Sequence, residues 1–238
     1  MADIGLTGLG TMGAALALNM AENGFTVAVH NRSRGRTDDL MSSAGELASN
    51  LEPLDDLAEF ASSLSAPRLI VIMVPAGGPV DAVIEALLPH LDQGDTLVDG
   101  GNADFNETRR REQALADKGF GFIGMGVSGG EDGARHGPSI MVGGPESSYK
   151  TLGPIVEAIA ARYQDNPCAA WLGPDGAGHF VKTVHNGIEY ADMELIAEVW
   201  GLLRASGRST KDAAALFAEW NTGPLHSYLV EITAEVLA

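Results

Sequence analysis

One lysine and one glutamate, seven residues apart, have side chains and a spacing that suit acid–base chemistry. Lys182 and Glu189 belong to the segment Gly178–Tyr190, and His185 and Asn186 lie between them. In a helix these four polar residues occupy positions i, i+3, i+4 and i+7, so they share one stripe. The two charged residues then stand about 10 Å apart along the helix axis, which leaves room for a small polyol between an amine and a carboxylate.

The surroundings of Lys182 favour a role as a general base. It is the only Lys, Arg, Asp or Glu between Gly176 and Ile188. We expect the helix to be largely buried, with a neighbouring apolar stripe facing a core: Phe180, Val184, Ile188 and Ala191. Burial would lower the pKa of an isolated ammonium group toward neutrality, where an amine accepts protons. The alternative is a lysine whose stem covers apolar surface while its ammonium group stays in water.

A glycine-rich turn near the N-terminus predicts nucleotide binding. It lies between an expected strand at residues 2–8 and an expected helix at Thr11–Asn23, and a second strand, Phe25–His30, completes a βαβ unit. In this setting the glycines permit a tight turn, and backbone amides at the helix N-terminus bind a pyrophosphate. The predicted cofactor contacts here are Gly8, Leu9, Gly10, Thr11, Met12 and Gly13. A merely structural turn is the alternative.

The residues after the second strand favour NADP over NAD. An NAD site usually ends this strand in Asp or Glu, which bonds the ribose 2′-hydroxyl. This chain runs His30-Asn-Arg-Ser-Arg-Gly-Arg36, with three arginines and no acid. We therefore expect Asn31, Arg32 and Ser33 at the cofactor, with Arg32 on a 2′-phosphate. The alternative is a basic loop that is simply solvated.

Alternating strand and helix patterns predict an α/β fold, a doubly wound Rossmann-type parallel sheet. Further strands are expected at Arg68–Val74, Thr96–Val98, Phe120–Gly124, Ser139–Val142 and Ala169–Leu172, and helices at Leu54–Ser63, Val80–Leu88, Glu107–Lys118 and Ser147–Arg162. Two expected loops, Asp99–Asn102 and Gly126–Gly130, follow strands where ligands collect. Asn102 and Ser128 offer hydrogen-bonding groups there for a carboxylate or a phosphate.

The chain changes character after Leu172. The segment Gly173–Gly178 is rich in helix breakers and predicts two domains, residues 1–176 and the start of an all-α domain at residues 177–238. We expect a long helix to Ala205 and a capping box at Ser209–Asp212 for the next helix. A last apolar face, Leu225, Leu229, Ile232 and Val236, is expected to be covered by further chain or by a partner subunit.

Composition excludes several classes of function. The 32 acidic and 15 basic residues give a formal net charge of −17, which argues against nucleic acid and anionic membranes as partners. A single cysteine, Cys168, excludes an intrachain disulfide and a cysteine-based metal cluster, and no histidine spacing suggests a metal site. The first residues do not show the basic segment followed by an apolar run that is typical of a signal peptide, and no 18-residue apolar run appears. We expect a soluble, cytoplasmic protein without a metal.

With these motifs in order, the chain resembles the N-terminal half of the 6-phosphogluconate dehydrogenases, the decarboxylating enzymes of the pentose phosphate pathway. The resemblance rests on Gly8–Gly13, Asn31–Ser33, Asp99–Asn102, Gly126–Gly130, Gly137–Met141, Gly176–Tyr190 and Trp220–Asn221. It implies oxidation of 6-phosphogluconate by NADP⁺ to ribulose 5-phosphate and CO₂, in a homodimer whose chains continue for as many residues again.

The resemblance also implies a role for particular residues. Lys182 would be the general base at the substrate 3-hydroxyl, and Glu189 the acid that protonates C1 of the enediol. Substrate contacts are implied for Asn102, Ser128, Gly129, Gly130, His185, Asn186 and Tyr190, and further cofactor contacts for Val74, Pro75, Ala76 and Asn102. Pro75 stands where this family usually has Lys, and Gly10 where it usually has Ala. The alternatives are a β-hydroxyacid dehydrogenase that does not decarboxylate, and a non-catalytic NADP-binding module.

Overall fold

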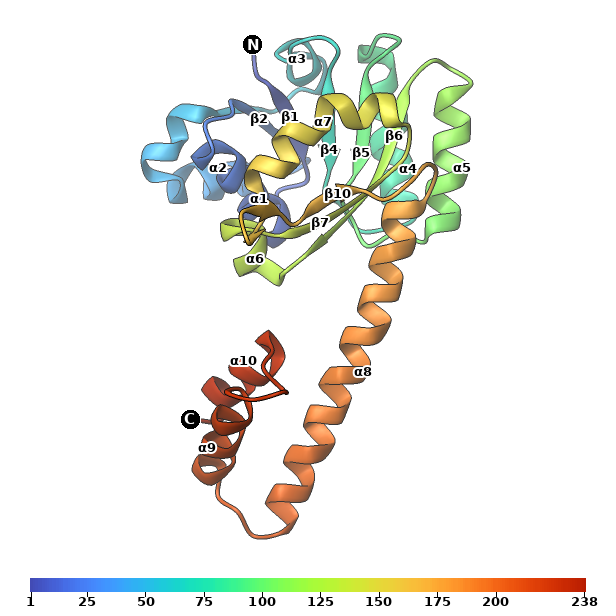
Figure 1. The fold of residues 1–238 in the computed structure, drawn as a ribbon. Helices are drawn as coiled ribbons and strands as arrows, with labels where there is room; N and C mark the ends of the chain where they lie inside the picture. Colours follow the sequence, from blue (N-terminus) through green and yellow to red (C-terminus); the bar gives the residue numbers. More distant parts are fainter. The chain divides into compact units, whose positions relative to one another are not determined.

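The computed structural model describes residues 1–238, which form two compact units, Met1–Thr183 and Val184–Ala238 (Figure 1). Helix α8 (Ala177–Ala205) begins in the first unit and continues in the second. The domain boundary predicted after residue 176 therefore lies at the start of α8, whereas the change of compact unit comes within that helix. No helix of either unit combines the length and hydropathy that crossing a bilayer requires.

An eight-stranded sheet organises the first unit, in the order β10-β7-β6-β5-β4-β1-β2-β3. Its strands are β1 (Ile4–Thr7), β2 (Val27–His30), β3 (Leu51–Leu54), β4 (Leu69–Ile72), β5 (Thr96–Asp99), β6 (Gly121–Ser128), β7 (Ser139–Gly143) and β10 (Ala169–Trp171). A separate two-stranded ribbon pairs β8 (Arg162–Tyr163) with β9 (Asn166–Pro167). The predicted doubly wound Rossmann-type fold is confirmed.

The sheet is mixed rather than wholly parallel, because β6 and β7 are antiparallel while the other neighbouring pairs are parallel. The connection between Ser128 and Ser139 is shorter than the dozen or so residues that a parallel crossover needs. The chain therefore turns back along β6. Pairing with β7 also extends β6 to Ser128, so the prediction that this strand ends at Gly124 was wrong.

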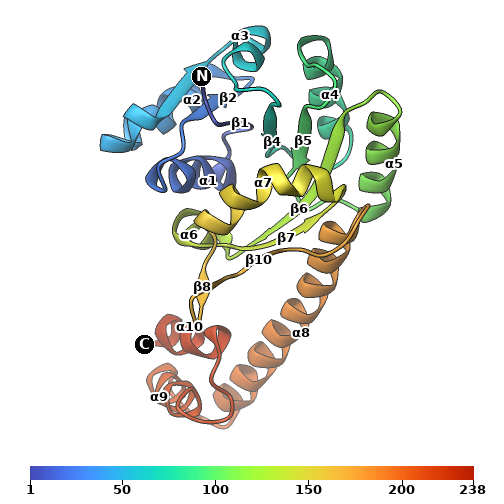
Figure 2. The same ribbon diagram turned by 45° about the horizontal axis from the view of Figure 1, so that its top comes forward.

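Helices cover both faces of this sheet (Figures 1 and 2). They are α1 (Thr11–Glu22), α2 (Arg34–Ser43), α3 (Leu57–Ser62), α4 (Gly78–Leu87), α5 (Phe105–Ala116), α6 (Gly130–His136) and α7 (Glu146–Ile159), with 3-10 turns η1 (Gly45–Asn50) and η2 (Leu88–His90). The sequence did not predict α2 or β3. The helix expected at Leu54–Ser63 begins only at Leu57, because the Asp56 carboxylate accepts hydrogen bonds from two backbone amides there.

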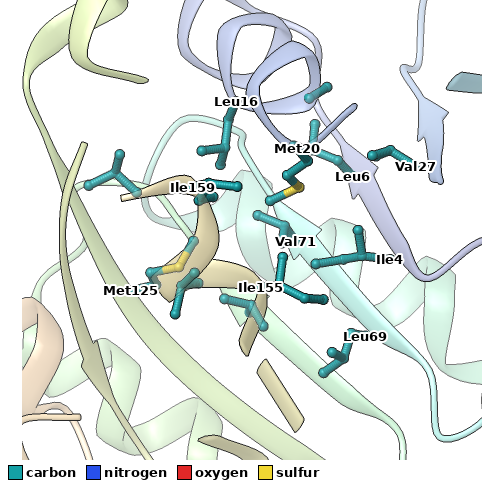
Figure 3. Packing of buried hydrophobic residues seen from close by; sticks show 14 of the residues in the cluster. Ile4, Leu6, Leu16, Met20, Val27, Leu69, Val71, Met125, Ile155 and Ile159 are labelled. Atoms are coloured by element: carbon teal, nitrogen blue, oxygen red, sulfur yellow. The ribbon is translucent and has the colours of Figure 1, made fainter. Parts of the chain in front are cut away.

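Two buried clusters hold the layers together. On one face, α1 and α7 pack against the sheet through residues such as Leu16, Met20, Val71, Ile155 and Ile159 (Figure 3). On the other face, α3, α4 and the end of α5 contribute to a cluster with Phe60, Ile70, Ile84, Leu115 and Phe122. Adjacent residues of β4 alternate between the two clusters, which is why this strand is apolar throughout.

The second unit contains the remainder of α8 together with α9 (Thr210–Trp220) and α10 (Tyr228–Leu237). The predicted capping box is present: Asp212 N donates to Ser209 Oγ over 3.1 Å, and Ser209 N donates to Asp212 Oδ2 over 3.3 Å. Phe217 is buried, and its ring packs edge-on against Trp220 with centroids 5.1 Å apart. Helices α9 and α10 pack against each other.

The prediction of a largely buried helix after Gly178 was wrong. Only Gly178, His179 and Lys182 of α8 are buried, and the apolar stripe Phe180, Val184, Ile188 and Ala191 is exposed rather than facing a core. Phe180 and Ile188 expose 49% and 60% of their surface. Periodicity identifies an apolar face, but it does not specify what covers that face.

Candidate functional site

The glycine-rich turn connects β1 to α1 and is shaped by close backbone contacts. Gly8 has a φ of +100°, in the region that favours glycine. A Cβ on Gly13, in the first turn of α1, would lie 2.0 Å from the carbonyl oxygen of Gly8. Gly10 precedes α1 and meets nothing within 4 Å of a Cβ position. No side chain caps the N-terminus of this helix, so its first backbone amides are available to bind an anion.

A cleft of about 280 Å³ opens at this turn. Its lining comes from the start of α1 and from the carboxyl ends of β4, β5 and β6, and comprises Gly10, Thr11, Met12, Gly13, Met73, Val74, Gly100, Gly101, Asn102 and Val127. Of the residues predicted for the cofactor, Gly8 and Leu9 are buried within the turn, whereas Pro75 and Ala76 are exposed outside the lining. Met73 and Val127 were not predicted. Val127 lies inside the predicted loop Gly126–Gly130, and Met73 lies near the end of the predicted strand Arg68–Val74; these positions were the available signal.

The residues after β2 divide into two groups. The Asn31 side chain accepts a hydrogen bond from Leu9 N over 2.9 Å and donates to Ser33, so it ties the glycine turn to the end of β2. Arg34 forms salt bridges to Asp38 and Asp55. Arg32 is exposed. The structure therefore gives Asn31 and Ser33 local hydrogen-bond partners and leaves the side chain of Arg32 exposed between them in the chain.

The two predicted loops follow β5 and β6, which are adjacent parallel strands and therefore end at one edge of the sheet. After β5, Gly101 N donates to the buried Asp99 carboxylate over 3.1 Å, and Asn102 is exposed at the cleft. After β6, the expected loop at Gly126–Gly130 is shorter than predicted, because Ser128 is still the last residue of the strand. Gly129 and Gly130 then lead into α6, with φ values of +124° and +61°.

The first turns of α8 lie against β6. Lys182 exposes only 7% of its surface, and a Cβ on Gly126 would lie 2.6 Å from Lys182 Cβ. One turn earlier, a Cβ on Gly124 would lie 2.8 Å from His179 Nδ1. Alternate positions of β6 thus hold glycine where the helix approaches, and Ser128 continues the same face. Lys182 is buried because two glycines let α8 come this close.

The other predicted residues of α8 lie in the second unit. His185 Nδ1 is 3.5 Å from Glu189 Oε2 and 3.3 Å from Asn186 Oδ1, so these three side chains share one stripe, as the helical spacing predicted. Tyr190 exposes 69% of its surface. No three His, Cys, Asp or Glu side chains in the chain are grouped so that they could hold a metal ion.

The chain matches two family models that together cover most of its length. Residues 3–173 match the NAD binding domain of 6-phosphogluconate dehydrogenase, and residues 178–238 match the C-terminal domain of 6-phosphogluconate dehydrogenase. The first match includes the glycine turn and both strand-end loops, and the second includes Lys182 and Glu189. Each site identified from residue types therefore lies inside one of the two matched regions.

Individual relatives agree with these models. The NAD⁺-dependent, decarboxylating 6-phosphogluconate dehydrogenase of Bacillus subtilis is 51% identical over 99% of this chain, and the NADP⁺-dependent, decarboxylating enzyme of the same organism is 49% identical over 98%. A solved structure of Plasmodium falciparum 6-phosphogluconate dehydrogenase matches 99% of this chain with a TM-score of 0.94 and 39% identity. The chain spans about half the length of the relatives it matches, 50% in each of these three cases.

Proposed function

Because the chain belongs to the 6-phosphogluconate dehydrogenase family, we propose that it supplies the nucleotide-binding and proton-transferring part of an enzyme that oxidises 6-phosphogluconate to ribulose 5-phosphate and CO₂. The observation that carries this proposal is the burial of Lys182 against Gly126, the residue before Val127 in the cleft lining. A buried amine beside a nucleotide cleft suits proton removal from an alcohol that loses hydride.

The cleft fits a dinucleotide at its phosphates. Uncapped amides of α1 face the phosphates, and Gly100 and Gly101 in the same lining would allow close approach of the nicotinamide half. We propose NADP as the cofactor, with Arg32 at the 2′-phosphate and Asn31 and Ser33 beside it. The exposure of Arg32 after β2 supports this assignment. The relatives include both NAD⁺-dependent and NADP⁺-dependent enzymes, so the choice rests on Arg32.

In the proposed mechanism, the neutral amine of Lys182 accepts the proton of the 3-hydroxyl as hydride leaves C3. The bound nicotinamide supplies the hydride acceptor. The C1–C2 bond of the resulting 3-keto acid then breaks, CO₂ leaves, and the bonding electrons move into the C3 carbonyl. Protonated Lys182 stabilises that oxyanion and returns its proton to it, which gives the enediol. Glu189 then protonates the enediol carbon that was C2 of the acid and becomes C1 of the product. Lys182 takes back the proton of the hydroxyl on the former C3, and ribulose 5-phosphate forms.

The remaining predicted residues orient the substrate in this proposal. Amide and hydroxyl groups around the sugar acid would come from Asn102, Ser128, Gly129, Gly130, His185 and Asn186, and Tyr190 would contact the phosphate. His185 lies beside Glu189, which supports a shared role for these two side chains. The carboxyl group of a glutamate next to an imidazole can give a proton to the substrate while the imidazole holds the side chain in place.

We also propose a cytoplasmic homodimer acting in the pentose phosphate pathway. The exposed apolar side chains of α8, including Ile188, Leu195 and Leu202, support coverage by other protein surface. Light scattering of the purified protein over a range of concentrations tests the assembly. A mass that stays at that of one chain contradicts it.

The activity is tested by measuring CO₂ release from 1-¹⁴C-labelled 6-phosphogluconate with NADP⁺ or NAD⁺, with Lys182→Met as the negative control. The expected result is equal amounts of CO₂ and reduced nucleotide, abolished in the variant. Oxidation of 3-hydroxyisobutyrate without CO₂ release would instead indicate a β-hydroxyacid dehydrogenase. Tight NADP⁺ binding without turnover of either substrate would indicate a binding module in this chain.

A further inference from the structure

Three buried ionisable side chains lie beneath the loop that follows β5, and no step of the proposed mechanism uses them. Asp99 ends β5, Arg111 lies in α5, and His179 lies in the first turn of α8; they expose 0%, 2% and 1% of their surface. Burying charged groups costs free energy unless they are paired and hydrogen-bonded. Their presence beneath a ligand-binding edge therefore needs a physical reason.

Arg111 connects two loops that contribute to the cleft. Its Nε and Nη2 donate to the Asp81 carboxylate over 2.9 and 3.0 Å, and Nη2 also donates to the carbonyl of Gly77 over 3.0 Å. Gly77 closes the loop after β4, whose first residues Met73 and Val74 line the cleft. On the other side, Nη1 lies 3.7 Å from Asp99 Oδ2, at the start of the loop after β5. One guanidinium group thus spans both loops.

His179 connects the same cluster to α8. His179 Nδ1 lies 2.7 Å from Thr108 Oγ1 of α5, and the tautomer of the ring determines which of the two atoms donates. Burial lowers the pKa of His179 and outweighs the opposing influence of Asp99 and of the nearby backbone of Gly101 and Asp99. The ring is therefore neutral at pH 7.

The cluster is incompletely hydrogen-bonded. Asp99 Oδ2, Arg111 Nη1 and His179 Nε2 are all buried without a hydrogen-bond partner, whereas Asp99 Oδ1 accepts from Gly101 N. An arrangement of this kind adds less stability than fully paired groups would. It does, however, hold one carboxylate oxygen on the loop and keep the other near the guanidinium group of α5.

We propose that Asp99, Arg111 and His179 are positioning residues that hold the Gly100–Asn102 loop at a set distance from the turn of α8 that carries Lys182. His179 precedes Lys182 by three residues, so the two side chains lie on the same face of α8 in successive turns, and both contact β6. Asp99 precedes Asn102 by three residues, and its carboxylate accepts a hydrogen bond from the backbone amide of Gly101. The inference rests on the proposed function, because it assigns these residues to the nicotinamide end of the nucleotide cleft.

The proposal predicts different effects on binding at the two ends of the cofactor. The loop held by Asp99 faces the nicotinamide end, whereas the ribose phosphate end is assigned to Asn31 and Arg32 after β2, on the far side of β1 in the sheet. Loss of the cluster should therefore weaken binding of a complete dinucleotide and leave binding of an adenosine phosphate fragment unchanged. A residue that merely stabilises the fold would affect both ligands alike.

The test measures binding of NADP⁺ and of adenosine 2′,5′-bisphosphate by titration calorimetry, together with the urea midpoint of unfolding. The variant is Asp99→Asn, which keeps the size of the side chain and an oxygen for Gly101 N but removes its charge. The matched control is Thr96→Val, which lies on the same strand and removes a buried hydrogen bond to Ser148 Oγ of 3.1 Å at the opposite end. Both variants lose one buried polar interaction.

Asp99→Asn is expected to weaken NADP⁺ binding about tenfold, while the fragment affinity changes less than about twofold. Thr96→Val should lower the urea midpoint and change neither affinity. Unchanged NADP⁺ affinity in Asp99→Asn, or equal weakening of both ligands, overturns the inference. His179→Gln keeps a polar atom near the position of Nε2 but loses the contact with Thr108. It must show the same selective loss of NADP⁺ affinity, and it is the decisive variant if Asp99→Asn does not fold. An unmodified chain that binds neither ligand overturns the proposed nucleotide site itself.

Discussion

Two glycines of the nucleotide turn, three residues apart, should respond very differently to the same substitution, one strongly and the other hardly at all. A Cβ on Gly13 would lie 2.0 Å from the carbonyl oxygen of Gly8 and 3.1 Å from Met73 Cβ. A Cβ on Gly10 would meet nothing within 4 Å, and the φ of −71° and ψ of −178° at Gly10 suit any residue. The pair Gly13→Ala and Gly10→Ala therefore tests whether the turn requires glycine only where a Cβ would contact the backbone, or at every position of the motif.

The magnitudes follow from these distances. Carbon and oxygen atoms do not approach closer than about 3.2 Å without repulsion, so in Gly13→Ala the turn must open by roughly 1 Å. Overpacking of this kind costs about 1–3 kcal/mol of unfolding free energy. A displacement of about 1 Å in the amides that hold a pyrophosphate should weaken nucleotide binding about 100-fold. Gly10→Ala should cost less than about 1 kcal/mol and change the affinity less than about threefold.

Titration calorimetry with NADP⁺ and urea unfolding measure both quantities on the same preparations. Gly35→Ala, at an exposed helical position with nothing within 4 Å of its Cβ, controls for the effect of adding a methyl group to a glycine. If Gly13→Ala binds NADP⁺ as tightly as the unmodified chain, the steric argument is wrong. Equal loss of binding in Gly10→Ala and Gly13→Ala would also contradict it, because only one of the two methyl groups has a neighbour to displace.

Three further predictions concern charge and capping. Arg32→Asp should move the preference between NADP⁺ and NAD⁺ toward NAD⁺ by about tenfold or more, since a charge-assisted hydrogen bond is lost; an unchanged ratio of the two dissociation constants contradicts the 2′-phosphate assignment. The hydrogen bond from Arg111, followed by that from Arg110, lowers the pKa of Asp81 from 3.8 to about 2. Asp81 therefore stabilises the fold above pH 3.8 and loses this effect as the pH falls toward 2. Because the Asp81 side chain is 35% exposed, solvent screening reduces its contribution to about 1–2 kcal/mol. In urea titrations, Asp81→Asn should therefore lower the unfolding free energy at pH 7. The difference from the unmodified chain should become smaller as the pH falls below 4. Ser209→Ala removes the capping box and should cost about 1 kcal/mol, seen as faster hydrogen exchange of the first α9 amides with no change in those of α1.

Local patterns predicted the elements whose causes are local. The glycine turn, the strands on either side of α1 and the capping box of α9 depend on residues close together in the chain, and all are present. The end of β6 was misplaced because it depends on pairing with β7, a partner that local pattern does not reveal. The burial of α8 was overestimated for a similar reason, since an apolar stripe does not specify its cover.

The positioning cluster was missed although one signal was available. Arg111 follows two other arginines, and such a run resembles a solvated helix face. Helical phase places Arg111 on the stripe of Thr108 and Leu115, which is the buried face of α5. His179 similarly lies one turn before Lys182. A charged residue in phase with buried neighbours was therefore the sign that this arginine is internal.

The two faces of β6 place opposite demands on side-chain size. Gly124, Gly126 and Ser128 face the approaching helix, while Ile123 and Met125 fill the core on the other side. A slip of register by one residue would drive a branched or long side chain into α8 and leave a hole opposite, so competing alignments of this strand are excluded. Tolerance to mutation along β6 should consequently alternate at every second residue, limited by bulk on one side and by polarity on the other.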